Sequence, residues 1–401
     1  MDSRLRHKGG HPGGHKTRPY GETKQNVGWV GAGLVPARMD KNVPVEILIV
    51  KLSAIGDVVH TLAFLDVLHQ NFPKAKIDWL VEESAAGVIE GHPAIRRVII
   101  SRRKSWWLKL VEGPCFGEVS REIFSFLKEM RHVRYDCVID LQGLLKSGVL
   151  AGLSRAERKV GMSGAREGAW LFLKEPSVKV NYDQHAIDRY LEVATQLGCQ
   201  WDRWDNRIPV SETHRHTLDQ LLAGHGFTGG NLVAINPMAK WKTKLWEPDL
   251  FAALGDRILT EFPCRIVFTG SQDDRPIIEN ISSMMKNRPL NLAGKTGLKE
   301  LASLYDRCRV LITTDTGPMH MAAAMGCPVV ALFGPTSPLR TGPYGPGHRV
   351  MASGTVCSPC FKKTCDQWSC MRDITVESVF EAVREVFLLE KTSKSQKNDN
   401  A

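Results

Sequence analysis

The sequence predicts an α/β protein made of two doubly wound domains that face one cleft. Short, continuously apolar runs of strand length alternate with stretches of helical periodicity, and this rhythm occurs once in each half of the chain. Such an alternation is typical of a parallel sheet that helices cover on both faces. The chain has 401 residues, which suits two domains of ~100–200 residues each.

The expected elements follow one another in a similar order in the two halves. In the first half we expect strands at 46–50, 77–81, 97–100 and 137–141 and helices at 57–70, 118–130, 143–153 and 184–197. In the second half we expect strands at 232–235, 265–268, 310–313 and 329–333 and helices at 248–260, 274–285, 298–306 and 318–325. Because ligands bind beyond the carboxyl ends of the strands in such sheets, the loops that follow strands are the candidate sites.

The remaining segments mark the domain limits. Residues 1–41 are rich in glycine and basic residues without periodicity, which predicts a disordered basic tail, and residues 391–401 predict a second disordered tail. Between the tails we expect a first domain at 42–205 and a second domain at 206–375, joined by a linker near Pro209 at 203–216. A last helix at 376–390 follows a loop region that is rich in Cys, Pro and Gly.

Composition and charge exclude several classes of protein. No run approaches the ~18 uninterrupted apolar residues of a membrane-spanning helix. The formal net charge of +10 lies mostly in the tails, because residues 1–41 carry +5 and residues 391–401 carry +2, which leaves +3 for the body. A body charge of +3 is low for a nucleic-acid-binding protein, and it suits a small acidic substrate or an anionic lipid surface.

The first candidate site follows the first expected strand, where the chain reads Lys51-Leu-Ser53-Ala-Ile-Gly56-Asp57. Gly56 permits a tight turn and a close approach of the backbone to a ligand. Asp57 then stands at the start of a helix, at the carboxyl end of the strand, where a carboxylate can act as a general base toward a hydroxyl. The alternative is structural, because Asp is a common N-cap that stabilises a helix by ~1 kcal/mol.

The second candidate site follows the strand at 310–313, where the chain reads Thr314-Asp315-Thr316-Gly317-Pro318-Met319-His320. Pro318 suits the first turn of a helix, whose free N–H groups form an anion site suited to a diphosphate. Asp315 can accept hydrogen bonds from sugar hydroxyls, and His320 can reach the same ligand from one turn further on. The alternative is a capped helix with an incidental histidine.

Two basic segments have a similar ambiguity. Lys240, Lys242 and Lys244 follow the first strand of the second half, where lysines can neutralise phosphates or simply be solvated. The run from Arg102 to Lys104 precedes two tryptophans. It is either a surface run of charge or a basic, aromatic patch for an anionic acceptor at a membrane surface.

The cysteines give little support for a metal site. Ten cysteines in 401 residues are too few for a disulfide scaffold, and six of them are scattered. The other four, Cys357, Cys360, Cys365 and Cys370, could hold Zn²⁺ or, less readily, an iron–sulfur cluster. Only the first pair has the short spacing usual for zinc, so free or redox-labile thiols are favoured, and we expect no metal and no cofactor.

The absence of an Asp-x-Asp motif bears on how a diphosphate would be bound. The chain also contains no Walker loop and no His-Glu-x-x-His motif. A metal-bridged diphosphate site of the Asp-x-Asp kind is therefore disfavoured. Lysine side chains and helix N-termini would have to meet the charge of a departing diphosphate instead.

Taken together, these motifs resemble the heptosyltransferases of lipopolysaccharide inner-core synthesis in glycosyltransferase family 9. The resemblance covers roughly residues 45–389 and rests on segments that occur in order: ILIVKLSAIGDVVHT, KIDWLVEE, LQGLLKS, KTKLW, TTDTGPMH and FGPTSP. The strand EILIV and the segment KIDWLVEE look most like heptosyltransferase I, which adds the first heptose to Kdo–lipid A. The Cys-rich segment looks more like heptosyltransferase II.

The resemblance implies a GT-B fold of two Rossmann-like domains, of which the first binds the acceptor and the second binds the ADP-sugar. The helix at 376–390 would cross back onto the first domain. The implied reaction is an inverting, metal-independent transfer of heptose from ADP-L-glycero-D-manno-heptose to the Kdo or inner-core region. The implied partners are ADP-heptose, Kdo–lipid A or inner-core lipopolysaccharide and the anionic inner membrane of a Gram-negative bacterium, at its cytoplasmic face, and not nucleic acid.

Individual residues match the motifs of the family. Asp57 matches its general base, and Lys244 matches the lysine that stabilises the departing diphosphate. The implied donor-binding residues are Met238, Ala239, Asp274, Thr296, Asp315, Thr316, Gly317 and His320. The implied acceptor-binding residues are Ser53, Gly56, Arg102, Arg103, Lys104 and Lys146. Asp274 is shorter than the usual Glu, and Met238 and Ala239 replace hydroxyl residues of some members.

Two alternatives stay open at this point. The same fold could use another nucleotide sugar or a heptosyltransferase II-like acceptor. The chain could also be a non-catalytic module that binds an anionic ligand through its basic patch.

Overall fold

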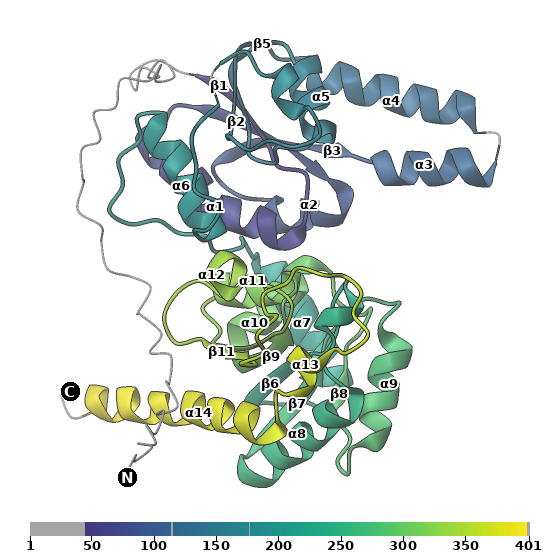
Figure 1. The fold of residues 1–401 in the computed structure, drawn as a ribbon, viewed down its shortest axis with the longest axis vertical. Coiled ribbons are helices and arrows are strands. Elements are labelled where there is room, and N and C mark those ends of the chain that lie inside the picture. The colour runs from purple at the N-terminus through teal and green to yellow at the C-terminus, as the bar shows by residue number, and fades with distance from the viewer. Residues whose placement is uncertain (1–44, 114, 176, 399–401) are drawn as a thin grey trace, which may run out of the picture.

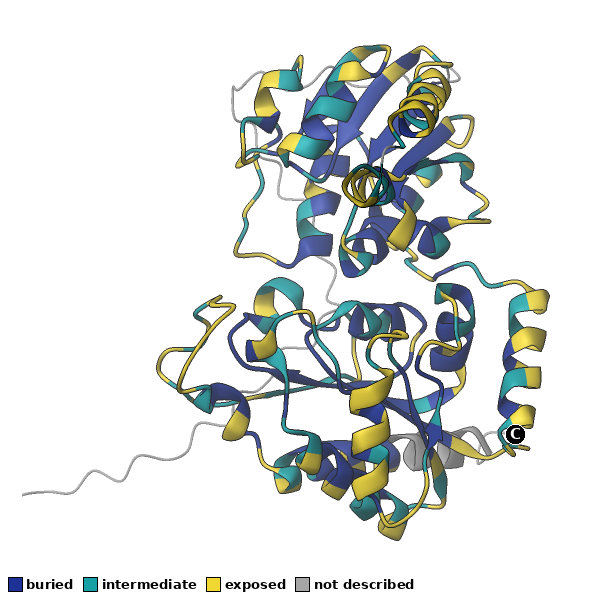
Figure 2. Ribbon diagram, turned by 90° about the vertical axis from the view of Figure 1, so that its right-hand side faces the viewer, coloured by how far each residue is buried: buried dark blue, intermediate teal, exposed yellow. Residues whose placement is uncertain are grey.

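The computed structural model describes residues 45–113, 115–175 and 177–398, and it arranges them in two α/β lobes (Figure 1). Each lobe is built on one parallel sheet. Figure 2 shows the strands in dark blue between helices whose outer faces are yellow, so the apolar strand residues form the two cores. The tail expected at 1–41 lies outside the described residues.

The first lobe contains a sheet with the strand order β3-β2-β1-β4-β5. Its strands are β1 (Glu46–Val50), β2 (Lys76–Glu82), β3 (Ile95–Ser101), β4 (Tyr135–Asp140) and β5 (Ala156–Gly161). Its helices are α1 (Ile55–Asn71), α2 (Glu83–Ile89), α3 (Arg103–Glu112), α4 (Phe116–Met130), α5 (Leu145–Leu153), η1 (Ala169–Phe172) and α6 (Ala186–Gln196). Ile47 to Val50 are fully buried, as a strand covered on both faces requires.

The second lobe contains a sheet with the strand order β11-β10-β9-β6-β7-β8. Its strands are β6 (Asn231–Asn236), β7 (Cys264–Phe268), β8 (Leu290–Asn291), β9 (Cys308–Thr314), β10 (Val329–Phe333) and β11 (Arg349–Ala352). Its helices are α7 (Glu212–Gly224), η2 (Lys242–Lys244), α8 (Pro248–Glu261), α9 (Arg275–Met284), α10 (Leu298–Arg307), α11 (Gly317–Ala324), α12 (Pro338–Thr341), α13 (Ser369–Arg372) and α14 (Val376–Asn398).

In each sheet the strand order changes direction at one point, and the candidate residues lie at these two points. β1 lies between β2 and β4, and β6 lies between β7 and β9. Connections diverge at such a point and leave a crevice at the carboxyl ends of the strands. Asp57 follows β1, whereas Lys244 follows β6 and Asp315 follows β9. The predicted sites therefore occupy the crevice of each lobe.

The two lobes pack directly on each other. Helix α1 contacts α11 across the boundary, and α2 contacts α10. One cluster of buried apolar side chains includes Ile49 and Leu62 of the first lobe and Met319 and Ala331 of the second. The two crevices are thereby held face to face.

The strands and helices expected from the sequence are all present. Three strands were not predicted. β5 is a charged strand at one edge of the first sheet. β8, which has two residues, and β11 are the two edge strands of the second sheet. Helices α2, α3 and α7 and the short helices α12 and α13 were not expected. Helix α7 begins inside the stretch expected to be a linker, because the Ser211 hydroxyl caps the N–H group of His214.

The last helix differs from the expectation in two ways. Its described side chains pack against the second lobe, on α8, β9, β10 and β11, and not back on the first lobe. The apolar face formed by Val379, Phe380 and Val383 is buried in the core of the second lobe, and this burial fixes its position. The helix also continues through residues 391–398, which were expected to be disordered. Helix propagation from a buried segment costs little.

None of the helices in the described part of the chain combines the length and the apolar character that a membrane-spanning helix requires.

Candidate active site

Asp57 lies in the first turn of α1, in the crevice beyond β1. Its Oδ2 accepts a hydrogen bond from the backbone N–H of Ala54 at 3.1 Å. Its Oδ1 accepts a hydrogen bond from the Tyr190 hydroxyl at 3.4 Å and lies 4.0 Å from Nζ of Lys51. The side chain is nevertheless 40% exposed. The carboxylate is therefore oriented by the protein and is still open to an incoming hydroxyl.

A buried chain of hydrogen bonds through Lys51 and Tyr190 holds the Asp57 carboxylate. Nζ of Lys51 donates to the Leu141 carbonyl at 2.8 Å and to the Tyr190 hydroxyl at 2.6 Å. Burial lowers the pKa of Lys51, although the charges of Asp57 and Asp140 oppose that shift. Burial also raises the pKa of Tyr190, so its hydroxyl keeps its proton and donates to Asp57.

The N-termini of α1 and α11 meet at the boundary between the lobes. A Cβ atom at Gly56 would lie 2.2 Å from Cδ2 of His320, so this position requires glycine. A Cβ atom at Gly317 would lie 3.2 Å from Cβ of Ile55. The structure thus brings Gly56, the neighbour of Asp57, against the segment that contains His320.

A histidine pair fixes the tautomer of His320. Nε2 of His60 lies 2.9 Å from Nδ1 of His320, and Nδ1 of His60 is buried without a hydrogen-bond partner among the described groups. Burial lowers the pKa of both rings, so both are neutral at pH 7. A buried N–H without a partner is costly, so the proton of His60 sits on Nε2 and is donated to His320. His320 must then carry its own proton on Nε2, where it can donate to an anion.

Lys244 places a positive charge at the carboxyl ends of β6 and β9. Its Nζ contacts Oδ2 of Asp315 at 2.6 Å and lies 4.6 Å from the ring centre of Trp241. The Thr336 hydroxyl donates to the same Asp315 oxygen at 2.7 Å. Both members of the ion pair are largely buried, with 14% and 7% of their side chains exposed. The ammonium group is therefore held in place before any ligand arrives.

The other expected donor residues lie on successive loops at the same edge of the second sheet. Thr316 is the N-cap of α11, and its side chain makes no capping hydrogen bond. Pro318 has no N–H group and the Met319 N–H donates to the Thr316 carbonyl at 3.2 Å, so the Gly317 N–H is the group in this first turn that faces a ligand. The Met238 carbonyl, next to Ala239, accepts a hydrogen bond from the Thr314 hydroxyl at 2.9 Å. Thr296 follows β8. Oδ2 of Asp274 holds its own loop, because it accepts from the N–H and the hydroxyl of Ser271.

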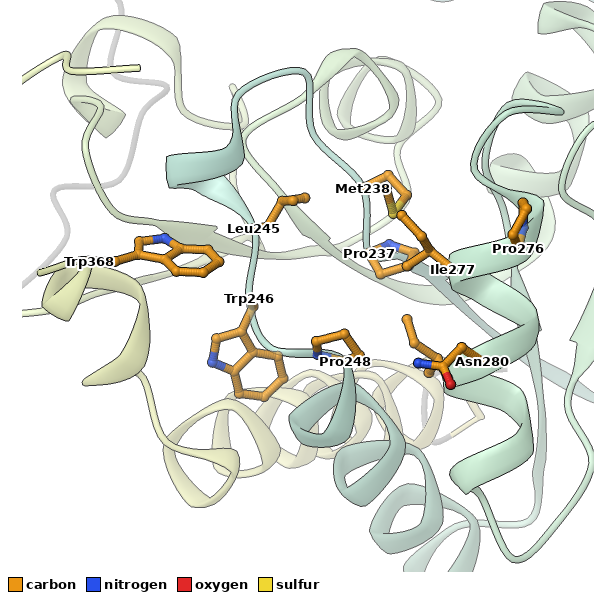
Figure 3. Close-up of a pocket in the computed structure, with 10 residues that line it drawn as sticks. Pro237, Met238, Leu245, Trp246, Pro248, Pro276, Ile277, Asn280 and Trp368 are labelled. Carbon is orange, nitrogen blue, oxygen red and sulfur yellow. The ribbon is translucent and has the colours of Figure 1, made fainter. Parts of the chain in front are cut away.

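A cavity of about 440 Å³ lies beside the donor loops, between α9 and the loop after β6 (Figure 3). Its lining is almost wholly apolar and includes Trp246, Ile277 and Trp368, with Asn280 as a polar side chain. Among the expected donor residues, Met238 lines it, whereas Asp57 and Lys244 do not. The charged chemistry therefore belongs to the boundary between the lobes and not to this cavity.

Three expected acceptor residues, Lys146, Arg103 and Lys104, converge on Glu82 at the carboxyl end of β2, and Ser53 joins them through Lys146. Nζ of Lys146 contacts Oε1 of Glu82 at 2.9 Å and the Ser53 hydroxyl at 2.8 Å. Arg103 donates to the same Oε1 at 3.2 Å, and Nζ of Lys104 lies 3.3 Å from Oε2. Burial opposes ionisation of Glu82, but the hydrogen bonds from these cations, the first of them from Lys146, leave its pKa lowered. Three cations around one carboxylate leave a net positive charge for an anion.

Arg102 takes a different partner. Its Nε donates to Oε1 of Glu83 at 3.1 Å, and both side chains are more than half exposed. An exposed pair of this kind holds its members weakly. Arg102 therefore lies next to the Glu82 cluster without being part of it.

The four clustered cysteines are free thiols. Cys357 and Cys365 are exposed, Cys360 is half-buried and Cys370 is buried. Within the described ranges, no three His, Cys, Asp or Glu side chains converge in an arrangement that would hold a metal ion. The geometry thus gives the zinc interpretation no support.

Sequence reasoning assigned no role to four residues of this site: Lys51, which stands in the first candidate motif, and His60, Glu82 and Tyr190. Lys51 directly follows the buried strand β1, and Glu82 is the last residue of β2. A charged residue at the carboxyl end of a buried strand indicates a candidate site residue, so both could have been found from the sequence. His60 lies one turn after Asp57 on the same helix. Tyr190 is 133 residues away from Asp57 in the chain, and nothing in its local sequence indicates the contact.

Comparisons with known proteins decide the family. Residues 123–369 match the model of glycosyltransferase family 9 (heptosyltransferase), which is more than half of the chain. The lipopolysaccharide heptosyltransferase 1 of Pseudomonas aeruginosa is 32% identical over 330 residues, which are 80% of this chain and 87% of that protein. The chain belongs to glycosyltransferase family 9. This family 9 chain is therefore a glycosyltransferase, as its motifs indicated.

Solved structures confirm the fold of this family 9 enzyme. A glycosyltransferase of family 9 from Veillonella parvula superposes with a TM-score of 0.75 at 27% identity, covering 88% of this chain and 99% of that one. The Escherichia coli heptosyltransferase WaaC, solved with ADP, gives a TM-score of 0.69 at 27% identity, covering 85% and 99%. The expected GT-B architecture of two parallel sheets is confirmed.

Proposed function

We propose that this family 9 enzyme transfers heptose from ADP-L-glycero-D-manno-heptose to the Kdo or inner-core region of lipopolysaccharide. The transfer would invert the anomeric carbon and would need no metal ion. The relative in Pseudomonas aeruginosa is a lipopolysaccharide heptosyltransferase 1, and WaaC was solved with ADP. The observation that carries the proposal is the meeting of α1 and α11, which sets the open carboxylate of Asp57 near the uncapped helix start of the other lobe.

The residues on the two sides of the boundary can perform one in-line displacement. The acceptor hydroxyl gives its proton to Asp57 while its oxygen forms a bond to the anomeric carbon. The bond from that carbon to the diphosphate oxygen breaks, and ADP leaves with the electron pair. Lys244, Nε2–H of His320 and the Gly317 N–H at the start of α11 then stabilise the developing negative charge. One base and one site for the departing anion suffice for inversion.

The donor would lie along the edge of the second sheet. Asp315 and Thr316 would contact the sugar and the diphosphate, and Gly317 would let the phosphate approach the backbone. Asp274 and Thr296 would contact the nucleoside, with the ribose on Asp274. Met238 and Ala239 lack side-chain hydroxyls, so their contacts would come from the backbone.

The acceptor would lie against the first lobe. Lys146, Arg103 and Lys104 are anchored by Glu82, and their remaining N–H groups can pair with Kdo carboxylates or lipid A phosphates. Arg102, Ser53 and the backbone at Gly56 would extend this site. An acceptor of this kind places the enzyme at the cytoplasmic face of the inner membrane of a Gram-negative bacterium, as a peripheral protein that has no nucleic acid partner.

A transfer assay tests the proposal. The purified chain is incubated with ADP-heptose and Kdo–lipid A, and the lipid is analysed by mass spectrometry for the addition of one heptose. Parallel reactions use UDP- and GDP-sugars as donors, and an acceptor that already carries one heptose. Transfer only from another nucleotide sugar would contradict the donor, and addition only to the heptosylated acceptor would indicate a heptosyltransferase II-like enzyme.

A further inference from the structure

Helices α3 and α4 form a hairpin that projects from the first lobe (Figure 1). The two helices are joined along their inner faces, where the rings of Trp106 and Phe126 pack edge to face with centres 5.4 Å apart. Nε1 of Trp106 donates to Glu122 at 2.8 Å, and Nζ of Lys109 contacts Glu118 and Glu122. The hairpin is therefore a preformed unit and not a pair of loose helices.

The outer faces of this hairpin are apolar. On α3, Trp107, Leu108 and Val111 are 68%, 54% and 66% exposed, and their spacing of one and four residues places them on one face. On α4, Phe116 is 66% exposed and Phe124 is 71% exposed. The solvent face of a surface helix is normally polar, so these exposed side chains indicate a surface that another apolar medium covers.

Basic side chains lie among the exposed apolar ones. Arg103 and Lys104 precede Trp107 and Leu108 by one turn on α3, and both are more than half exposed. On α4, the exposed residues Arg121 and Lys128 lie one turn before and one turn after Phe124.

The acidic side chains of α4 lie on a different face. Glu118 and Glu122 turn toward Lys109 of α3, and Glu129 follows them at helical spacing. The segment 102–131 carries seven basic and four acidic residues. Glu112, in the last turn of α3, is the acidic exception to this segregation. The outer face of α4 therefore combines aromatic and cationic groups.

We infer that this hairpin, through the described helices α3 (Arg103–Glu112) and α4 (Phe116–Met130), docks the enzyme on the surface of an anionic phospholipid bilayer. Aromatic rings partition into the interfacial region of a bilayer, and Lys and Arg pair with anionic head groups beside them. The inference rests on the proposed function in one respect, because a lipid-linked acceptor requires the enzyme to work at a membrane surface. Helix α3 begins at the cation cluster on Glu82, so docking through α3 would bring that cluster to the level of the head groups.

Co-sedimentation with vesicles tests the docking without donor or acceptor. The wild-type chain should bind vesicles of phosphatidylcholine and phosphatidylglycerol at least about ten-fold more tightly than vesicles of phosphatidylcholine alone. The variant with Trp107→Gln and Phe124→Gln should lose about ten-fold or more of that affinity. The variant with Arg121→Gln and Lys128→Gln should lose the preference for phosphatidylglycerol. Leu339→Gln, at an apolar residue of the second lobe that is 65% exposed, is the matched control and should bind like the wild type.

Two results would overturn the docking surface. One is equal vesicle binding by the wild type and by both hairpin variants, with circular dichroism showing that the variants are folded. The other is a change of oligomeric state in the hairpin variants with unchanged vesicle binding, which would make the hairpin an interface between copies of the chain.

Turnover measurements separate this inference from the proposed reaction. With an acceptor embedded in vesicles the aromatic double variant should be slow, and with a delipidated, water-soluble acceptor it should equal the wild type. An equal loss of turnover on both acceptors would mean that the two substitutions slow the enzyme by disturbing its fold and not by weakening its binding to vesicles. If the chain bound vesicles and transferred no heptose, the proposed function would fail while the docking surface stood.

Discussion

The hydrogen-bond chain from Lys51 through Tyr190 to Asp57 shows how one carboxylate can serve as both helix cap and base. The N-cap of α1 is Ala54 and not Asp57, and Asp57 caps the helix from its third position, where Oδ2 accepts from the Ala54 N–H. The other oxygen, Oδ1, accepts from the Tyr190 hydroxyl. Burial of Lys51 and Tyr190 keeps this support in one geometry. The structural and catalytic interpretations of Asp57 are therefore compatible, and the sequence pattern alone could not choose between them.

Replacing Asp57 tests its role as the base. Asp57→Ala should lower the rate of transfer by about 10²–10⁴-fold, because the acceptor proton would have no positioned partner. ADP binding, measured by calorimetry, should stay nearly unchanged, since the proposed ADP contacts are in the other lobe. Near-normal turnover in this variant would remove Asp57 from the mechanism.

Lys244 should behave differently, because in the proposed mechanism the diphosphate contacts it both before and during the reaction. Lys244→Ala should weaken ADP binding and also lower turnover by about 10²-fold or more. The exposed neighbour Lys242 provides a control, and Lys242→Ala should leave both quantities close to wild type. Equal effects of the two substitutions would indicate a general charge effect and not a site.

The identity of the site residues was predictable only where a motif carries them. Asp57, Lys244 and Asp315 sit in loops that follow apolar strands, so pattern and topology identify them together. Tyr190 and Glu82 act through contacts that the fold creates, between segments far apart in the chain. Those partners require the three-dimensional packing and could not be read from local spacing.

At the level of elements, the contact of α1 with α11 joins the two lobes beside the candidate site. It depends on two glycines at helix starts, of which Gly56 has no free space beside it. The apolar strands and amphipathic helices were predictable because burial dictates their periodicity. The edge strand β11 has no buried residue, and the first half of β5 is charged, so neither shows a continuous apolar run. Helix α2 has seven residues, which is too short to display a helical period.

A methyl group at Gly56 should disturb this contact. Gly56→Ala would place Cβ 2.2 Å from Cδ2 of His320, so α1 and α11 must move apart or the imidazole must turn. We expect a loss of about 1–3 kcal/mol in the free energy of unfolding, together with weaker turnover. Gly87→Ala is the control, because a Cβ there would meet ordinary contacts at 3.4 Å. Equal stability of the two variants, measured by denaturant unfolding, would show that the contact yields easily.

The position of α14 shows a limit of inference by family resemblance. The resemblance implied a helix that returns to the first lobe, and the apolar face of the helix instead binds the second lobe through Val379, Phe380 and Val383. Amphipathic periodicity predicts that a helix has a buried face, but it does not say which core that face joins.

At the level of the whole molecule, three buried histidines lie where the lobes meet. His60 and His185 belong to the first lobe, and their ring centres are 4.9 Å apart. Nε2 of His185 lies 3.0 Å from the Gly342 carbonyl of the second lobe, and His320 completes the group. Burial lowers the pKa of His185 to about 3 and lowers those of His60 and His320 as well.

These lowered pKa values predict a pH-dependent stability. The unfolded chain binds protons at these histidines below pH ~6.5, whereas the folded chain does not, so the free energy of unfolding falls as the pH falls. The slope is about 1.4 kcal/mol per pH unit for each such histidine. Between pH 6.5 and 5 the melting temperature should therefore drop, and the drop should be shallower in His185→Gln. An identical slope in that variant would contradict the assignment. Burial also lowers the pKa values of His92 and His348, so these rings add to the slope, and the difference between the wild type and His185→Gln isolates the contribution of His185.

The α1–α11 contact has a consequence for anyone who would build hybrid enzymes from this scaffold. A donor half taken from one relative and an acceptor half taken from another must agree at Gly56, His60 and His320, because these positions fit each other and not a generic surface. Hybrids that take both α1 and α11 from the same parent should keep the contact between the two lobes. Hybrids that take α1 from one parent and α11 from another should lose the fit between these helices. The unit of exchange is thus the pair of facing helices and not either half of the chain.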